Sequence, residues 1–189
     1  MAKWAVIYSS VTGNTKQIAE AIAKEAESHA EGCDLFRVQD APQDVSGYEI
    51  VFLGYWLRLG APDPLMLKYL PKVTGTKVCF FQTHGTAPTS EHAITSFARA
   101  GYLLGPDCEI LGTYGCRGKI NPALLQKRTN LGPDDPHVGP ESVKRWELAS
   151  THPDQQDLAD AAYYVQGMAK KLAMKKRFLA MKAAKAAQA

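Results

Sequence analysis

The feature that most constrains the fold is a short apolar run that passes through a hydroxyl-rich loop directly into a helical pattern. The apolar run is Ala5–Tyr8, the loop is Ser9–Thr15, and residues 16–22 carry the helical pattern. A short apolar run of this kind is typical of a buried strand. The sequence therefore predicts a strand–loop–helix unit, with the loop at the C-terminal end of the strand and at the N-terminus of the helix.

The composition of this loop favours a phosphate-binding site. Gly13 lets the backbone turn so that successive N–H groups can face one point, and a helix N-terminus attracts an anion. The loop has no lysine and matches neither GxxxxGKS/T nor GxGxxG, so it suits a monophosphate held by neutral donors. The alternative is an ordinary turn with a serine or threonine helix cap. The side-chain donors are Ser10, Thr12, Asn14 and Thr15.

Alternating strand and helix patterns predict an α/β fold. The run Ile50–Gly54 is continuously apolar, which is typical of a parallel sheet covered on both faces. We expect a doubly wound five-stranded parallel sheet with helices on both faces, and a ligand site beyond the C-terminal strand ends. Strands are predicted at residues 3–8, 33–38, 50–54, 77–82 and 109–114, and helices at 14–28, after 64, at 90–100 and from about 153.

The charge distribution separates a mildly acidic body from a basic tail. Residues 170–189 contain seven of the 22 basic residues and no acidic residue, so residues 1–169 carry 15 basic and 19 acidic residues, a net charge of −4. An acidic body argues against general nucleic-acid binding. The predicted organisation is a single domain at 1–170, with an irregular extra segment at 116–152, and a basic helical extension at 171–189. The extension is either a solvated helix end or a site that docks on an acidic partner or an anionic membrane surface.

Cysteine usage and hydropathy predict a cytoplasmic protein without a metal site or an integral membrane segment. The four cysteines are widely spaced, with no CxxC pair, as expected of free thiols in a reducing compartment. No run of about 18 apolar residues exists, and the chain begins on a predicted strand, which leaves no room for a signal peptide. Cys116 is expected to be a packed thiol rather than a redox group.

Two further loops follow predicted strands at the same edge of the sheet as the phosphate loop. In residues 54–63, Tyr55 and Trp56 could present a flat face to a planar ligand or could pack in the core. Arg58 could stabilise an anionic ring or be a solvated charge. In residues 82–92, small side chains would let backbone N–H groups approach a ligand, and His84 is either an acid or stacking group or a surface residue.

The motif Ser-Val-Thr-Gly-Asn-Thr at residues 10–15 matches, without a mismatch, the phosphate motif S/T-x-T-G-N-T of flavodoxin-type FMN-binding proteins. The chain resembles this family over residues 2–115 and the final helix. The resemblance implies the sheet order 2-1-3-4-5, FMN bound without covalent attachment and redox chemistry on its ring. The cofactor-binding residues it implies are Ser9, Ser10, Val11, Thr12, Gly13, Asn14, Thr15, Tyr55, Trp56, Leu57, Arg58, Gly60, Thr83, His84, Gly85 and Thr86.

The chain departs from the family pattern in two places. Its third loop lacks the tyrosine or tryptophan that often covers the outer face of the flavin, and residues 116–152 have no counterpart in short flavodoxins. The extra segment resembles an elongated flavodoxin-like subgroup of anaerobic bacteria, and Trp146 is expected to anchor it on the body.

Three functions remain open after this reading. The first is electron transfer to or from a partner enzyme. The second is an NAD(P)H-dependent FMN oxidoreductase or quinone reductase acting on a small molecule. The third is a non-redox module on the same fold. The redox partner would be a protein or NAD(P)H, and no catalytic residue is assigned.

Overall fold

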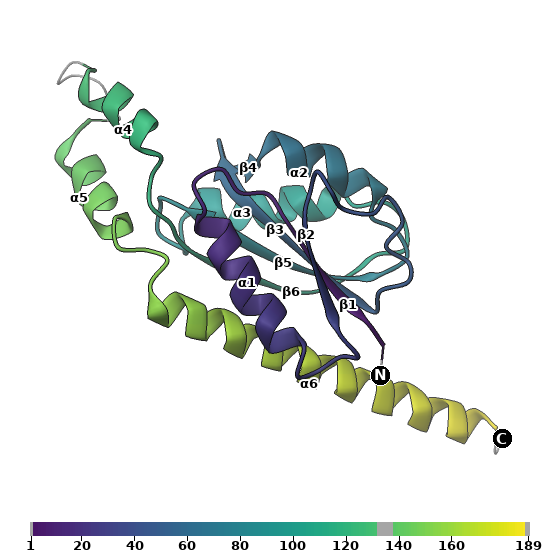
Figure 1. The fold of residues 1–189 in the computed structure, drawn as a ribbon. Coiled ribbons are helices and arrows are strands. Elements are labelled where there is room, and N and C mark those ends of the chain that lie inside the picture. Colours follow the sequence, from purple (N-terminus) through teal and green to yellow (C-terminus); the bar gives the residue numbers. More distant parts are fainter. Residues whose placement is uncertain (1, 132–137, 188–189) are drawn as a thin grey trace.

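The structure is a computed structural model that describes residues 2–131 and 138–187. Its centre is a sheet of five parallel strands with helices on both faces (Figure 1). Their order across the sheet is β2-β1-β3-β5-β6, which confirms the predicted order, because the short strand β4 (Ala61–Pro62) pairs only with the end of β3. The parallel strands are β1 (Trp4–Tyr8), β2 (Cys33–Arg37), β3 (Ile50–Arg58), β5 (Lys77–His84) and β6 (Glu109–Arg117).

Each face of the sheet has its own layer of helices and its own apolar core. Phe52 and Phe81 belong to one core, whereas Leu53 and Phe80 belong to the other. Successive residues of a strand point to opposite faces, so a sheet covered on both sides needs continuous apolar runs. The first layer consists of α1 (Asn14–Ala26) and α6 (Gln155–Ala186), and the second of α2 (Pro64–Tyr69), the 3₁₀ turn η1 (Leu70–Lys72) and α3 (Glu91–Tyr102).

Strand β3 is longer than the sequence predicted. It continues past Gly54 to Arg58 and turns back into β4 through Leu59 and Gly60. Both turn residues have positive φ angles, 51° and 70°, as in a two-residue hairpin. The guanidinium of Arg99 donates hydrogen bonds to both turn carbonyls, at 3.3 and 2.7 Å. The second predicted loop is therefore largely a rigid β-hairpin.

The extra segment is more regular than expected, because it contains α4 (Pro122–Thr129) and α5 (Pro140–Ala149). Residues 132–137 lie outside the described residues. Figure 1 shows both helices standing off one end of the sheet. The backbone N–H of Lys119 donates to the carbonyl of His152 at 2.8 Å, which closes the base of the segment. We call residues 118–152 the arm.

The last helix runs without interruption across the predicted boundary at residue 170. It begins with a reciprocal cap, in which Asp154 accepts from the N–H of Asp157 at 3.0 Å and Asp157 accepts from the N–H of Asp154 at 2.8 Å. Among the described residues, none of the helices combines the length and the apolarity needed to cross a membrane. All four cysteines are free, and burial raises the pKa of the Cys116 thiol to about 12, so this thiol is packed as expected.

Candidate functional site

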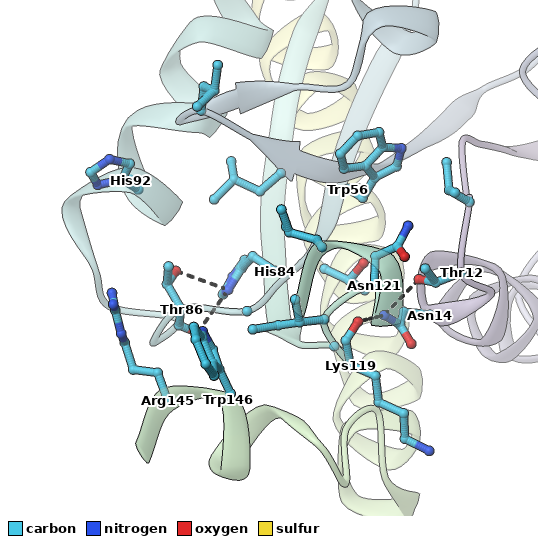
Figure 2. Close-up of a pocket in the computed structure, with 18 of the residues that line it drawn as sticks. Thr12, Asn14, Trp56, His84, Thr86, His92, Lys119, Asn121, Arg145 and Trp146 are labelled. Atoms are coloured by element: carbon cyan, nitrogen blue, oxygen red, sulfur yellow. Dashed lines mark hydrogen bonds between the residues drawn. The ribbon is translucent and has the colours of Figure 1, made fainter. Parts of the chain in front are cut away.

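A cavity of about 380 Å³ lies at the C-terminal edge of the sheet (Figure 2). Its walls come from the loop after β1, the β3–β4 hairpin, the loop after β5 and the arm. Ligands of doubly wound sheets bind at this edge, next to the central strands. Ten of the predicted binding residues line the cavity, namely Val11, Thr12, Asn14, Trp56, Leu57, Gly60, Thr83, His84, Gly85 and Thr86.

The helix behind the first loop begins without a side-chain cap. Gly13 occupies the N-cap position with φ 90°, and no side chain in the described parts of the chain caps the first turn of α1. The first N–H groups of a helix have no partner within the helix, so those of α1 remain able to bind an anion. In the same loop, the buried Oγ of Ser10 has no hydrogen-bond partner among the described residues. Ser10, Gly13 and Thr15 are not among the residues that line the cavity.

Hydrogen bonds hold the first loop in place from two sides. The amide of Asn14 donates to Oγ1 of Thr12 at 3.1 Å and to the carbonyl of Lys119 in the arm at 2.8 Å. The buried hydroxyls of Thr15 and Thr83 lie 2.9 Å apart, which joins the start of α1 to the end of β5. In such a pair one hydroxyl donates to the other, so the second proton is still free to bind a ligand.

Ser9 lies outside the cavity lining, in contrast to its predicted role. Its buried hydroxyl donates to Oδ1 of Asp63 at 2.8 Å. The same carboxylate oxygen accepts from the N–H of Leu65 at 3.0 Å and thereby caps α2. Burial raises the pKa of Asp63, and these hydrogen bonds oppose that shift. Ser9 therefore connects the first loop to the start of α2.

Tyr55 and Arg58 are also outside the cavity lining, which corrects the prediction for the second loop. Tyr55 is fully buried in the core, and its ring makes edge contacts with Phe80 and Phe97. Because β3 continues through Arg58, its side chains keep alternating between the two faces of the sheet. Tyr55 thus points to the α3 side, whereas Trp56 lines the cavity and Arg58 is exposed.

The loop after β5 places a buried histidine in the cavity wall. Nδ1 of His84 lies 3.1 Å from the carbonyl of Thr86 and, because a carbonyl only accepts, Nδ1 carries the proton. In the neutral ring Nε2 is then an acceptor, and it has no partner among the described residues. His84 is only 5% exposed, so it is not the surface residue that the sequence allowed.

Burial lowers the pKa of His84, and the charge of Arg117 adds to this effect. The unfolded chain therefore binds a proton near pH 6.5 that the folded protein does not bind. As a result, this group lowers the free energy of unfolding as the pH falls below 6.5. We expect His84→Asn to flatten the fall in the free energy of unfolding between pH 7.5 and pH 5.5, measured by urea unfolding without added ligand. The exposed His92→Asn is the matched control. An unchanged pH dependence in His84→Asn would refute a buried neutral imidazole.

The arm supplies cavity residues that the sequence did not predict. Instead of only anchoring the segment, Trp146 of α5 forms part of the cavity wall (Figure 2). The guanidinium of Arg128 lies 6.0 Å from the centre of its ring. The only local feature of the sequence that could have indicated this role is a tryptophan among basic residues in a segment that follows β6. The lining residues that were not predicted are Leu59 of the hairpin turn, His92 of α3 and, from the arm, Gly118, Lys119, Ile120, Asn121, Leu124, Arg128, Arg145 and Trp146.

The arm is fitted closely against the first and third loops. A Cβ on Gly118 would lie 2.8 Å from Nδ2 of Asn14, and a Cβ on Gly85 would lie 2.8 Å from Cγ1 of Ile120. The N–H of Gly118 also donates to the carbonyl of His84 at 3.0 Å. The cavity lining contains lysine and arginine side chains but no aspartate or glutamate among the described residues. The site therefore favours an anionic ligand.

Comparison with known proteins gives consistent matches over most of the chain. A family model described as a flavodoxin domain matches residues 5–166. The flavodoxin-like domain-containing protein BilS of Clostridioides difficile (strain CD3) is 32% identical over 166 residues, which cover 86% of this chain and 94% of that protein. The BilS protein of Clostridium symbiosum (strain WAL-14163) is 25% identical over 179 residues, with the same shares covered.

A solved structure shows the same fold. Oxidised flavodoxin 2 from Bacillus cereus aligns with a TM-score of 0.59 over 90% of this chain and 99% of that one. The two sequences are 17% identical, so this likeness concerns the fold alone.

Proposed function

This chain belongs to the flavodoxin domain family, and on that basis we propose that it binds FMN without covalent attachment and transfers electrons to or from a partner enzyme. The bound flavin supplies the capacity to accept and release one or two electrons. The contribution of the chain is to hold the phosphate, to orient the ring and to limit the access of water.

The observation that carries the proposal is the uncapped start of α1, together with the unpartnered Oγ of Ser10 in the loop that leads into it. A buried hydroxyl without a partner is unfavourable, and so is a helix terminus without partners, unless a ligand satisfies both. The terminal phosphate of FMN fits this need, because it accepts several hydrogen bonds and its charge is favourable at the N-terminus of a helix. The first loop would therefore bind the phosphate.

The rest of the cavity suits the planar ring of the flavin. Its volume of about 380 Å³ falls in the usual range for small-molecule sites. Trp56 offers an aromatic surface, and its buried Nε1 has no partner among the described residues. His84 offers an acceptor at Nε2, so a donor and an acceptor are both available to a heteroaromatic ring.

Electron transfer is preferred over catalysis on a small molecule because the described residues that line the cavity offer no carboxylate that could work with a histidine as an acid–base pair. Its lining has two histidines, His84 and His92, and no carboxylate among the described residues. The arm nevertheless favours a second candidate, an NAD(P)H-dependent reductase. Arg128 and Arg145 lie in a wall outside the three family loops, where they could attract the phosphates of a nicotinamide nucleotide.

The proposal predicts that the purified protein retains FMN, or gains thermal stability when FMN is added. Saturation at about 100 times the dissociation constant stabilises a protein by about 2.7 kcal/mol, which raises its melting temperature by several degrees. The measurement is the visible absorption spectrum followed by thermal unfolding with and without FMN. If no flavin is retained and the melting temperature does not rise, both flavin functions are wrong.

A second experiment separates the two candidates. The flavin-loaded protein is mixed anaerobically with NADH or NADPH, and the flavin absorbance is followed. An electron carrier should stay oxidised until a reductase or dithionite is added, whereas rapid bleaching by the nucleotide alone would identify a reductase. We propose a cytoplasmic setting for either activity, which is supported by the four free cysteines.

A further inference from the structure

The C-terminal part of α6 extends beyond the sheet. Lys175 pairs with Glu109, the first residue of β6, and Lys176 pairs with Glu49, directly before β3. Both partners lie at the N-terminal edge of the sheet, opposite the cavity. Residues 177–186 continue past this edge for about 15 Å at 1.5 Å per residue. In Figure 1 this end of α6 lies at the same end of the molecule as the N-terminus, away from α4 and α5.

One face of α6 carries an exposed apolar stripe. Tyr163, Met174, Phe178 and Met181 are 71%, 71%, 61% and 60% exposed. At 100° per residue these four side chains fall within a sector of about 60°. The buried Leu172 lies on the opposite side of the helix and contacts the core. The stripe therefore points directly away from the body of the protein.

Basic residues flank the stripe on both sides. Lys170 and Arg177 lie along one side, Lys182 along the other, and Lys185 continues the stripe toward the C-terminus. In the described part of the chain none of these four side chains forms an ion pair, unlike Lys175 and Lys176. No acidic residue occurs after residue 160. Apolar groups and unpaired cations thus share one convex surface.

We propose that this face of α6 binds reversibly to an anionic lipid membrane surface. Long basic side chains can lie along an apolar surface with their charges at its margin, which matches the arrangement around Phe178 and Met181. Cations near an anionic bilayer are attracted to its head groups, and apolar side chains on the same helix face insert at the interface. A second copy of the chain fits poorly, because it would bring like charges together.

Docking through this face leaves the cavity free. From Met174 to Met181 the stripe lies at and beyond the N-terminal edge of the sheet, whereas the cavity opens at the C-terminal edge. A membrane-bound molecule could therefore still admit a partner at the cavity. This inference depends on the charges and exposure of α6 and is independent of the proposed function.

The test is co-sedimentation of the full-length protein with phosphatidylcholine vesicles that contain or lack phosphatidylglycerol, at low and high salt. We expect binding only to the anionic vesicles, and weaker binding at high salt. Arg177→Gln combined with Lys182→Gln should weaken binding by about fivefold per charge. Phe178→Ser combined with Met181→Ser should weaken it further by removing the apolar contacts. These positions are exposed, and thermal unfolding checks that each variant is folded.

The matched control is Lys68→Gln combined with Lys72→Gln, which removes the same charge from exposed positions on α2 and η1. If this control weakens vesicle binding as much as the α6 variant, the proposal is wrong, because the effect is then one of net charge. It is equally wrong if the wild-type protein does not sediment with anionic vesicles at low salt. A concentration-dependent dimer abolished by the Phe178 and Met181 substitutions would assign the stripe to a second copy instead.

Discussion

Gly13→Asp is expected to abolish FMN binding while leaving the protein folded. An added Cβ at Gly13 meets no atom within 4 Å, and aspartate is among the residues that tolerate a positive φ angle. Its carboxylate would stand at the N-cap of α1, where it would accept the N–H groups that the phosphate needs and repel the dianion. We expect an affinity loss of about 3 kcal/mol or more, which is over a hundredfold.

The matched variant is Gly13→Asn, which has nearly the same shape but no charge. We expect it to bind FMN more weakly than the wild type but clearly more tightly than Gly13→Asp, as measured by quenching of FMN fluorescence during titration. Without FMN, both variants should melt somewhat below the wild-type temperature and by similar amounts, because any side chain at φ 90° is strained whatever its charge. Equal affinities for the two variants would contradict a phosphate at this loop.

Gly54→Ala is expected to cause a severe loss of stability. A Cβ at Gly54 would lie 1.9 Å from Cζ of Phe81, in the middle of the sheet. Neither residue can move easily, because β3 pairs with β1 on one side and with β5 on the other. Overpacking in a close-packed core costs about 1–3 kcal/mol, and a clash this short should reach or exceed the upper end. The measurement is the urea midpoint of unfolding, followed by circular dichroism.

Two further variants test the cause of this loss. Phe81→Leu removes the distal ring atoms that the new methyl group would meet, so Gly54→Ala should be less harmful in the Phe81→Leu background than in the wild type. Gly47→Ala adds the same methyl group at an exposed site with no atom within 4 Å, and its effect should stay within about 0.5 kcal/mol. If Gly54→Ala unfolds at the wild-type midpoint, Phe81 does not occupy the space over this glycine.

The parallel sheet could be predicted from continuous apolar runs that alternate with helical patterns, whereas the order of its strands came from the resemblance of residues 10–15 to the flavodoxin phosphate motif. The end of β3 could not be predicted, because a glycine in a strand pattern normally indicates a break or a bulge. Gly54 instead makes room for the ring of Phe81, which belongs to the adjacent strand. The prediction that the strand ends at Gly54 also led to the placement of Tyr55 in a binding loop. Because β3 continues, the side chain of Tyr55 points into the core on one face of the sheet.

The first loop of the site could be predicted because its donors, its glycine and the start of its helix are contiguous in the sequence. The arm could not, because its place depends on contacts between distant residues. Asn14 holds the carbonyl of Lys119, and Gly118 donates to the carbonyl of His84. No local periodicity encodes such contacts, so the sequence alone could not place Trp146 and Arg128 in the cavity wall.

The hydrogen bond between Lys119 and His152 joins the two ends of the arm, so the arm leaves the body of the protein and returns to it at one place. Helix α4 has no buried residue, whereas Ser142 and Ala149 of α5 are buried, so α4 contributes less to the packing of the protein than α5 does. Substitutions in α4 can therefore alter the wall of the cavity without weakening the fold. Leu124 and Arg128, which line the cavity from α4, are thus positions where a substitution changes the cavity but leaves the sheet and the first loop as they are.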